Sequence, residues 1–257
     1  MRIARFTVDN EIHFGAVQGA PGAETVTVLA GDPFYTGIHP TEQRHELADV
    51  RLLAPVIPRS KIVCVGRNYA DHAAEMGNEL PTSPMLFFKP NTSVVGPGDP
   101  VTLPSWTERV SYEAELAVVI GRICKDVPAE KADEVIFGYT AANDLTARDA
   151  QETDGQWARA KGFDGSCPLG PWIETELDPS DLRIASRVDG QTKQDSSTAQ
   201  MVFSVAEIIA YASAAFTLLP GDVILTGTPA GVGQVDEGDR IEVEVEGIGT
   251  LATVLRR

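Results

Sequence analysis

The sequence predicts a mainly β fold of the α+β class with few helices. The chain has 23 glycines and 17 prolines in 257 residues, and these residues end most of its short apolar runs. The pairs Asp9-Asn10 and Asp189-Gly190 each separate two strand-like runs, which is typical of hairpins. A single segment, residues 203–219, has the apolar spacing and capping residues of a longer helix.

Composition excludes several classes of protein. The apolar fraction of 43% and the charged fraction of 23% are ordinary for a globular chain, and the length suits one or two domains. A net charge of −16 argues against nucleic acid and anionic membrane as partners. No apolar run approaches the ~18 residues of a membrane helix, and the first residues lack the apolar core of a signal peptide. We therefore expect a cytoplasmic protein without membrane contact.

The cysteines and histidines give no sign of a transition-metal site. Cys64, Cys124 and Cys167 are odd in number and widely spaced, so neither a disulfide framework nor a zinc site is expected. The four histidines show no ligand spacing either.

Residues 1–57 are predicted to form a small N-terminal β domain. Residues 3–8 and 12–17 should pair as a hairpin, and residues 26–29 should add a strand. The polar run 41–46 is predicted to be a loop or a short helix. Pro55 and Pro58 mark the expected boundary, so residues 58–257 form the second domain.

The next segment combines a compact strand with a short helix. Residues 61–65 are apolar, and the pattern that follows predicts a helical turn capped by Asn68 and closed by Gly77. His72 and Glu75 lie three apart and would share a face of this helix. They are candidates for an acid/base pair, in which the carboxylate orients the imidazole. An exposed polar turn is the commoner explanation of such spacing. Residues 85–89 predict another strand, and residues 90–104 a loop.

Residues 112–122 form the most informative predicted strand. Side chains alternate along a strand, so Glu113 and Glu115 share one face, which continues into Ala117 and Val119. The opposite face is entirely apolar, and the strand is therefore expected to be buried on both sides. Two carboxylates in a low-dielectric site repel each other, and a divalent cation removes that cost. Oxygen-only ligands suit Mg²⁺ or Mn²⁺, with Ca²⁺ as a further candidate.

The alternative is that Glu-x-Glu marks a solvated face. Residues 241–246 illustrate it, because three glutamates alternate there with Ile241, Val243 and Val245. That pattern predicts a half-exposed strand that needs no metal.

Residues 128–164 supply the remaining polar candidates. A short helix is predicted over 128–136, and a strand over 137–142 runs into Asn143 and Asp144. Asp144 is the third candidate ligand, although alone it would more often be a turn residue. Arg148 and Lys161 follow and are candidates for binding an anionic substrate or an oxyanion, and Gln151 lies three residues after Arg148. Surface ion pairs are the plain alternative for each cation.

The last third predicts a hairpin, the long helix and a glycine-rich loop. Residues 183–188 and those from 192 on flank Asp189-Gly190, and Ser204 with Glu207 forms a capping-box pattern. The loop around Thr228 brings backbone N–H groups close to an oxygen anion. No Lys-Ser/Thr pair or helix follows, which argues against a nucleoside-triphosphatase. Residues 240–255 predict a final hairpin.

Taken together, the motifs resemble the fumarylacetoacetate hydrolase superfamily in its short bacterial form, similar to acylpyruvases and 2-hydroxyhepta-2,4-diene-1,7-dioate isomerases. The resemblance covers roughly residues 60–250. The motifs that carry it, in the family's order, are VGRNYADHAAEMG, LFFKP, GPGD, YEAELAVVIGR, GYTAANDLTARDAQ, KGFDGSCPLGP, PGDVILTGTPAGVG and GIGTL.

The resemblance implies a mixed β-sandwich or barrel-like roll, a homodimer, and a site occupied by Mg²⁺ or Mn²⁺. The implied metal ligands are Glu113, Glu115 and Asp144. The implied catalytic residues are His72, Glu75 and Lys161. The implied substrate contacts are Arg148, Gln151 and Thr228. Fumarylacetoacetate-cleaving members use a fourth carboxylate ligand, and its counterpart is not found in this sequence.

The resemblance also implies an activity on small anionic 2-oxo acids through a metal-chelated enolate. We expect C–C cleavage first, either hydrolysis of an acylpyruvate or decarboxylation of oxaloacetate. Isomerisation of a 2-hydroxyhepta-2,4-diene-1,7-dioate-type dienol in aromatic catabolism is the alternative. A non-catalytic small-molecule-binding protein with a structural metal is the second alternative.

Overall fold

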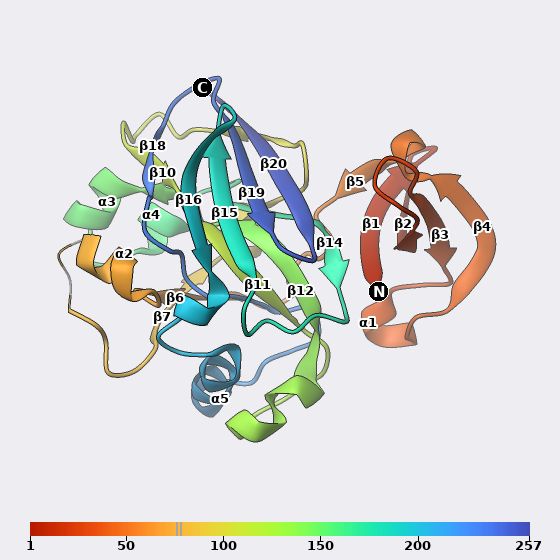
Figure 1. Ribbon diagram of the computed structural model, residues 1–257, viewed down its shortest axis with the longest axis horizontal. Coiled ribbons are helices and arrows are strands. Elements are labelled where there is room, and N and C mark those ends of the chain that lie inside the picture. Colours follow the sequence, from red (N-terminus) through yellow and green to blue (C-terminus); the bar gives the residue numbers. More distant parts are fainter. Residues whose placement is uncertain (76, 78) are drawn as a thin grey trace.

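Strands dominate the computed structural model, which describes residues 1–75, 77 and 79–257 (Figure 1). A smaller part made of the first residues lies at one side of a larger part made of the rest (Figure 1). Three hydrogen-bonded sheets account for the described strands, and they do not close into a barrel. The mainly β, sandwich-like class predicted from the sequence is confirmed. No helix in the described ranges is both long enough and apolar enough to cross a membrane.

The N-terminal part is a curled antiparallel sheet. Strands β1 (Arg2–Val8) and β2 (Glu11–Gln18) form the predicted hairpin, and both turn residues, Asp9 and Asn10, have the positive φ that a two-residue turn requires. The polar run predicted to be a loop or short helix is instead an exposed strand, β4 (Pro40–Glu46). Pairing with its neighbour creates this strand, and polarity alone did not reveal it. The remaining elements are β3 (Thr25–Leu29), α1 (Pro33–Thr36), η1 (Leu47–Asp49) and β5 (Arg51–Leu53).

One strand joins this part to the rest of the protein. Strand β1 pairs antiparallel with β14 (Cys167–Glu174), with Ile3 opposite Ile173. The N-terminal strands thereby extend the largest sheet, while Phe6 and Val26 bury a separate small core.

The largest sheet holds the acidic strand at its centre. Its further strands are β6 (Ile62–Gly66), β7 (Met85–Lys89), β8 (Val94–Val95), β11 (Ala114–Ile120), β12 (Ile136–Asn143) and β17 (Val223–Leu225). Strand β11 lies between β12 and β17, and all its residues are buried. Leu116 and Val118 pack in one apolar cluster and Ala117 and Val119 in another, which confirms the predicted burial of both faces.

A second layer packs against this sheet. It contains β9 (Pro100–Thr102), β15 (Arg183–Val188), β16 (Gln191–Ser197), β19 (Arg240–Val245) and β20 (Gly249–Arg256). The helical elements η3 (Ala129–Val135) and α5 (Val205–Ala215) lie at the lower edge in Figure 1, and η4 (Thr198–Gln200) directly follows β16. The predicted capping box of Ser204 and Glu207 starts α5. The helix ends before Phe216, earlier than predicted, because the backbone there is extended.

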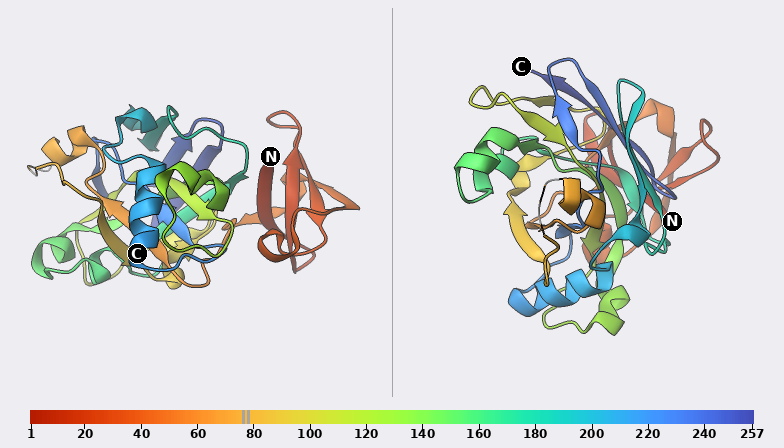
Figure 2. Two further views of the ribbon diagram at one scale, coloured as in Figure 1. Left: turned by 90° about the horizontal axis from the view of Figure 1, so that it is seen from below. Right: turned by 60° about the vertical axis from the view of Figure 1, so that its left-hand side comes forward.

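A small third group of elements frames the functional residues. It contains α2 (Ala70–Glu75), η2 (Asn91–Ser93), β10 (Val110–Tyr112), β13 (Thr146–Ala147), α3 (Arg148–Thr153), α4 (Ala158–Lys161) and β18 (Gly233–Val235). Figures 1 and 2 show α2, α3 and α4 on the same side of the molecule, around the ends of β6 and β7.

Candidate active site

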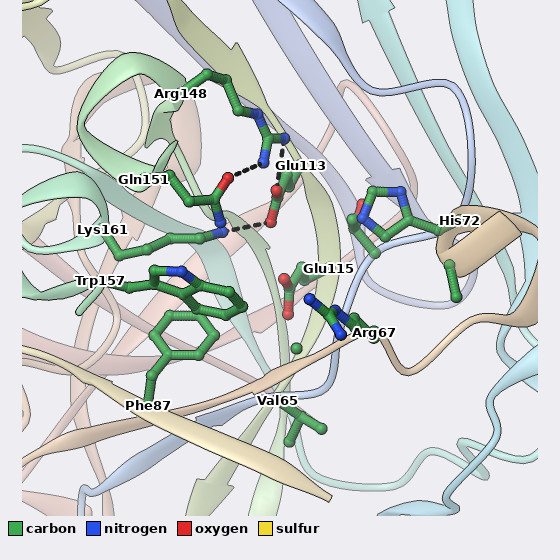
Figure 3. Close-up of a pocket in the computed structure, with 13 residues that line it drawn as sticks. Val65, Arg67, His72, Phe87, Glu113, Glu115, Arg148, Gln151, Trp157 and Lys161 are labelled. Atoms are coloured by element: carbon green, nitrogen blue, oxygen red, sulfur yellow. Dashed lines mark hydrogen bonds and ion pairs between the residues drawn. The ribbon is translucent and has the colours of Figure 1, made fainter. Parts of the chain in front are cut away.

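A cavity of about 200 Å³ lies where β6, α2, α3 and α4 approach the start of β11. Seven predicted site residues line it: His72, Glu113, Glu115, Arg148, Gln151, Lys161 and Thr228. The other two, Glu75 and Asp144, contact lining residues directly. Figure 3 shows how the labelled side chains among them converge from separate segments of the chain, namely His72, Glu113, Glu115, Arg148, Gln151 and Lys161. The structure therefore brings together all nine residues that the sequence singled out.

Three buried carboxylates lie close together at the site. Glu113, Glu115 and Asp144 each offer an oxygen within 4.8 Å of the others, and none is more than 5% exposed. Pairing of β11 with β12 sets Ala114 opposite Asn143, which brings the ends of both strands together. The Asp144 N–H donates to the Glu113 carbonyl at 2.9 Å. Glu113 itself lies in a short break between β10 and β11, at the predicted position but outside regular strand.

Three cations compensate these carboxylates. Lys161 donates to Glu113 at 2.7 Å and to Asp144 at 2.8 Å. Arg148 donates to the other oxygen of Glu113 at 2.7 Å. Lys89, which the sequence did not mark as functional, donates to Asp144 at 2.5 Å and is only 1% exposed. Buried charges are tolerated only when they are paired in this way.

The compensation is uneven across the three carboxylates. Burial alone would raise the pKa of Glu113, but Lys161 and Arg148 outweigh it and lower the pKa to about 2. For Lys161 the directions are reversed: burial alone would lower the pKa of the ammonium group, but the charges of Asp144 and Glu113 raise it. The ammonium is therefore charged. At Glu115, burial raises the pKa well above its ordinary value, and the charges of Asp144 and Glu113 raise it further. Within the described part of the chain, Glu115 therefore has no ion-pair partner, and its carboxylate accepts a hydrogen bond from the Gly227 N–H at 2.6 Å.

The site fits a hard divalent cation. Its donors are carboxylate oxygens, which Mg²⁺, Mn²⁺ and Ca²⁺ prefer, and a cation there would let Glu115 ionise. The buried Nδ2 of Asn143 and hydroxyl of Tyr69 have no hydrogen-bond partner among the described residues. Asn143 contacts Glu113. Burial raises the pKa of Tyr69 and the nearby charge of Glu115 raises it further, so both groups belong to this region. Unpartnered buried groups are expected where water or a ligand fills the neighbouring space.

The predicted acid/base pair forms on α2. Nδ1 of His72 lies 3.3 Å from Glu75, and His72 is 7% exposed at the cavity wall. The Gly231 N–H donates to both Glu75 oxygens at 3.1 Å, and Tyr112 donates to the Gly231 carbonyl at 2.7 Å. Glu75 is therefore held from the glycine-rich loop as well as from its own helix.

Asn68 does not cap α2 as predicted. Its side chain is fully buried and hydrogen-bonds to the backbone of Phe203 and Thr226. The residue instead ties the start of the helix to two distant segments, and the prediction of the cap was wrong.

The substrate-binding candidates differ in the hydrogen-bonding groups that their contacts within the protein leave for a ligand. The Gln151 carbonyl accepts from Arg148 at 2.9 Å, which leaves its NH₂ group for a ligand oxygen. Lys161 has three N–H bonds and uses two on carboxylates. The Thr228 hydroxyl donates to the Ala114 carbonyl at 2.9 Å, so toward a ligand it can only accept.

Comparison with known proteins gives the family. The model of the fumarylacetoacetate (FAA) hydrolase C-terminal family matches residues 61–256, and an Rv2993c-like N-terminal family model matches residues 1–55. The chain belongs to the fumarylacetoacetate hydrolase family. Both matches agree with the resemblance found in the sequence.

Relatives span several activities. Protein Rv2993c of Mycobacterium tuberculosis is 49% identical, with 100% of this chain and 98% of the relative covered. Oxaloacetate tautomerase Fahd2a, mitochondrial, of Rattus norvegicus is 42% identical over 79% of this chain and 69% of its own length.

Solved structures of relatives share the fold. The 5-carboxymethyl-2-hydroxymuconate delta-isomerase of Mycobacterium smegmatis is 47% identical, with a TM-score of 0.94 and complete coverage of both chains. The fumarylpyruvate hydrolase of Pseudomonas aeruginosa in complex with Mn²⁺ and pyruvate is 36% identical, with a TM-score of 0.74 over 85% of this chain and 94% of that one.

Several residues of the site were not singled out beforehand. Arg67 lines the cavity, as do Phe87 and Trp157, whose rings pack edge to face at 5.3 Å. Gln194 is fully buried and uses all its hydrogen-bonding atoms, which contact Ala114, Ser186, Thr228 and Pro229. Lys89 had a signal, since a lysine at the end of an otherwise apolar strand is unusual. Gln194 had none, because its partners are distant in sequence.

Proposed function

We propose that this protein is a divalent-metal-dependent enzyme that moves a proton beside the carbonyl of a small 2-oxo acid. One observation carries the proposal: buried His72, which pairs with the exposed Glu75, lines the same cavity as two members of a cation-supported cluster of three carboxylates. A cavity of about 200 Å³ is smaller than the roughly 300–1,000 Å³ of pockets for drug-sized ligands, which favours a substrate of few atoms.

Local cations make an anionic substrate compatible with a protein of net charge −16. Arg67, Arg148 and Lys161 all line the cavity. Glu113, Glu115 and Asp144 would hold the metal. A bound Mg²⁺ or Mn²⁺ supplies Lewis acidity to a carbonyl oxygen and lowers the cost of negative charge there.

His72 is the proposed base. Its Nδ1 faces the carboxylate of Glu75, so Nδ1 carries the proton and Nε2 carries the lone pair. Nε2 then accepts a proton from the carbon next to the carbonyl, and Glu75 stabilises the imidazolium that forms. The same nitrogen then returns the proton to the enolate, at its oxygen to complete a tautomerisation or at another carbon to complete an isomerisation.

Lys161 and Gln151 are the proposed donors to the negative charge that develops on the substrate oxygen. Each has an N–H bond left after its contacts within the protein. Preorganised donors of this kind are effective in a site from which water is excluded. Phe87 and Trp157 supply apolar walls that exclude it.

Tautomerisation or isomerisation needs no further group, because deprotonation and reprotonation by His72 complete it. The 42% identical tautomerase and the 47% identical isomerase support this outcome. Cleavage of a C–C bond, by hydrolysis or by decarboxylation, is the second candidate. The 36% identical hydrolase, solved with Mn²⁺ and pyruvate, supports it.

A turnover screen separates these outcomes. Protein stripped with EDTA and reloaded with Mg²⁺ or Mn²⁺ is given oxaloacetate, acetylpyruvate and a hydroxy-dienedioate, while enol absorbance and pyruvate release are followed. Metal-dependent change in absorbance without pyruvate supports tautomerisation or isomerisation. Metal-dependent pyruvate release identifies cleavage. No turnover of any of the three, with metal bound, would favour the non-catalytic binding protein.

Substitution of the base tests its role directly. We expect His72→Ala to lower kcat by roughly 10²–10⁴-fold, the usual contribution of a positioned acid/base group. The affinity for Mn²⁺ should stay nearly unchanged, because His72 is not among the three carboxylates. Exchange of His13, which lies in the N-terminal sheet, for alanine is the matched control and should retain full turnover. Full activity of His72→Ala on the same substrate would contradict the proposal.

A further inference from the structure

Arg67 is the one arginine or lysine on the cavity wall that has no ion-pair partner among the residues that the structure describes. Of the cations that line the cavity, Arg148 and Lys161 are both bound to Glu113 at 2.7 Å. No carboxylate of the described residues lies within ion-pair distance of Arg67. In a protein with 37 acidic residues, a half-buried guanidinium without a carboxylate partner leaves room for an external anion.

The backbone at Arg67 supports a role for its side chain. Its φ is 59°, in the left-handed region that residues with a Cβ rarely adopt. Glycine or asparagine would suit this position better, since both tolerate left-handed backbone. Strain of this kind persists where the surrounding structure imposes it, and it is concentrated at functional sites.

The neighbours of Arg67 impose this conformation. Gly66 ends β6 and pairs with Met85 in β7. Asn68, fully buried, is held through its side chain by Phe203 and Thr226, and its carbonyl accepts from the Val202 N–H at 2.8 Å. Because both neighbours are held in place, the direction in which the Arg67 side chain leaves the backbone is set, and this side chain lines the cavity.

The cations occupy different sides of the cavity. Figure 3 shows Arg148 and Lys161 gathered at Glu113, while Arg67 enters from another segment near Glu115 and His72. A small acid whose 2-oxo carboxylate lies toward Lys161 and Gln151 would present its other end toward Arg67. A guanidinium offers two parallel N–H bonds that match a carboxylate.

We infer that Arg67 binds the distal carboxylate of the substrate and thereby selects dicarboxylic over monocarboxylic 2-oxo acids. The inference rests on the proposed function, because it takes the cavity to be the site of a 2-oxo acid. It adds a specificity residue to a site whose other polar groups act near the reacting carbonyl.

Two ligands that differ only at the distal end provide the test. Oxaloacetate and 2-oxobutyrate have the same chain length, and a methyl group in the second replaces the distal carboxylate of the first. Binding to the Mn²⁺-loaded protein is measured by quenching of tryptophan fluorescence, since Trp157 lines the cavity, and by calorimetry. Turnover of oxaloacetate is measured separately.

The variants are Arg67→Asn, Arg67→Lys and the control Arg122→Asn. Asparagine removes the charge but tolerates the left-handed backbone. Lysine keeps the charge but lacks the two-pronged geometry. Arg122 is exposed and follows the opposite end of β11 from the carboxylates, so its substitution changes the net charge equally without touching the cavity.

We expect Arg67→Asn to weaken oxaloacetate binding by about tenfold or more, the usual loss for a charge-assisted hydrogen bond. Binding of 2-oxobutyrate should change by less than about threefold, with Arg67→Lys intermediate for oxaloacetate. The melting temperature of Arg67→Asn should equal or exceed that of the unsubstituted protein, because asparagine relieves the backbone strain. Arg122→Asn should leave both affinities unchanged.

The outcomes separate this inference from the proposed function. Selective loss of oxaloacetate binding, in a protein that turns over no 2-oxo acid, would uphold the role of Arg67 and refute the enzyme. If Arg67→Asn weakened the binding of both ligands equally, the effect would be a general electrostatic one, and the inference would be overturned. Unchanged affinity for oxaloacetate in Arg67→Asn would overturn it as well, and so would failure of the unsubstituted protein to bind either ligand.

Discussion

Two stretches of this chain carry glutamates at alternate positions, and they lie in opposite environments. Glu113 and Glu115, at the start of β11, are 5% and 2% exposed. Glu242 and Glu244, in β19, are half-buried and pair with Arg240 at 2.9 Å and Arg187 at 2.6 Å near the surface. The same spacing therefore yields a candidate metal centre in one place and ordinary surface ion pairs in the other.

The difference arises from the layers around each strand. Strand β11 has a partner strand on each edge and an apolar cluster on each face. Strand β19 turns Ile241, Val243 and Val245 toward the core and its glutamates away from it. Carboxylates in the first environment need cations close by, whereas water serves those in the second.

The largest effect should follow from removing the shared cation of the buried cluster. Lys161→Met leaves Glu113 and Asp144 without their common partner, and breaking a buried ion pair costs about 3–5 kcal/mol. Urea unfolding measures this change, and turnover should be lost as well. Lys193→Met, at an exposed position of strand β16, is the control and should stay within about 0.5 kcal/mol of the unsubstituted protein. Comparable stability of the two variants would contradict the expected difference in stability between the buried cluster and the surface of the protein.

Neutralising one glutamate in each region sharpens the comparison. Loss of a residue that only supports a metal ligand typically weakens metal binding by roughly 10–100-fold. Because Glu113 is a proposed ligand, Glu113→Gln should weaken Mn²⁺ binding by more than this. Glu242→Gln removes the same charge from β19 and should leave Mn²⁺ affinity and turnover within about twofold, as is usual away from a site. Calorimetric titration with Mn²⁺ measures both. A loss of thermal stability in Glu113→Gln without any loss of metal affinity would favour a structural role for the carboxylate.

The raised pKa of Glu115 predicts how metal binding depends on pH. Burial and the charges of Asp144 and Glu113 raise the pKa, so without metal the carboxyl group stays protonated well above the ordinary range for glutamate. Metal must displace that proton, and its affinity should therefore rise with pH until the pH passes the raised pKa. The slope is at most about tenfold per pH unit for one proton.

Calorimetry in two buffers of different ionisation heat measures the proton released on Mn²⁺ binding. Release of a proton by the unsubstituted protein, absent from Glu115→Gln at the same pH, is the expected result. Binding without proton release would mean that Glu115 is already ionised and that the neighbouring cations suffice.

The smallest effect is expected at the surface pair of β19. Arg187→Ala removes the contact with Glu244 at 2.6 Å, and solvent-accessible pairs near the surface contribute about 1 kcal/mol or less. Urea unfolding at low and high salt measures the contribution, which should shrink further as salt screens the charges. A loss as large as that of Lys161→Met would show that this strand also depends on its ion pairs.

Much of the candidate site was predictable because its residues lie in short, ordered motifs. The apolar continuation of the strand indicated that Glu113 and Glu115 are buried, and the strand end at Asn143 indicated that Asp144 lies beside them. Spacing placed His72 next to Glu75. Each of these predictions depends on local periodicity, which the backbone of a strand or helix enforces.

The supporting residues were not predictable in the same way. Lys89 reaches Asp144 from 55 positions away, and Gln194 reaches Ala114 from 80 positions away. The strand β4 was missed for a related reason, since its polar side chains give no pattern and its partner β3 supplies the hydrogen bonds. Nothing local in the sequence distinguishes these residues from exposed ones.

The sequence by itself determined which carboxylates, which histidine and which family to look for, because short-range periodicity and ordered motifs are written along the chain. The tertiary structure alone decided the charge state and access of those groups. Whether a carboxylate is ionised depends on burial and on cations brought from other strands, as the opposite pKa shifts of Glu113 and Glu115 show. These two residues are separated by a single alanine, and only the fold around them makes them different.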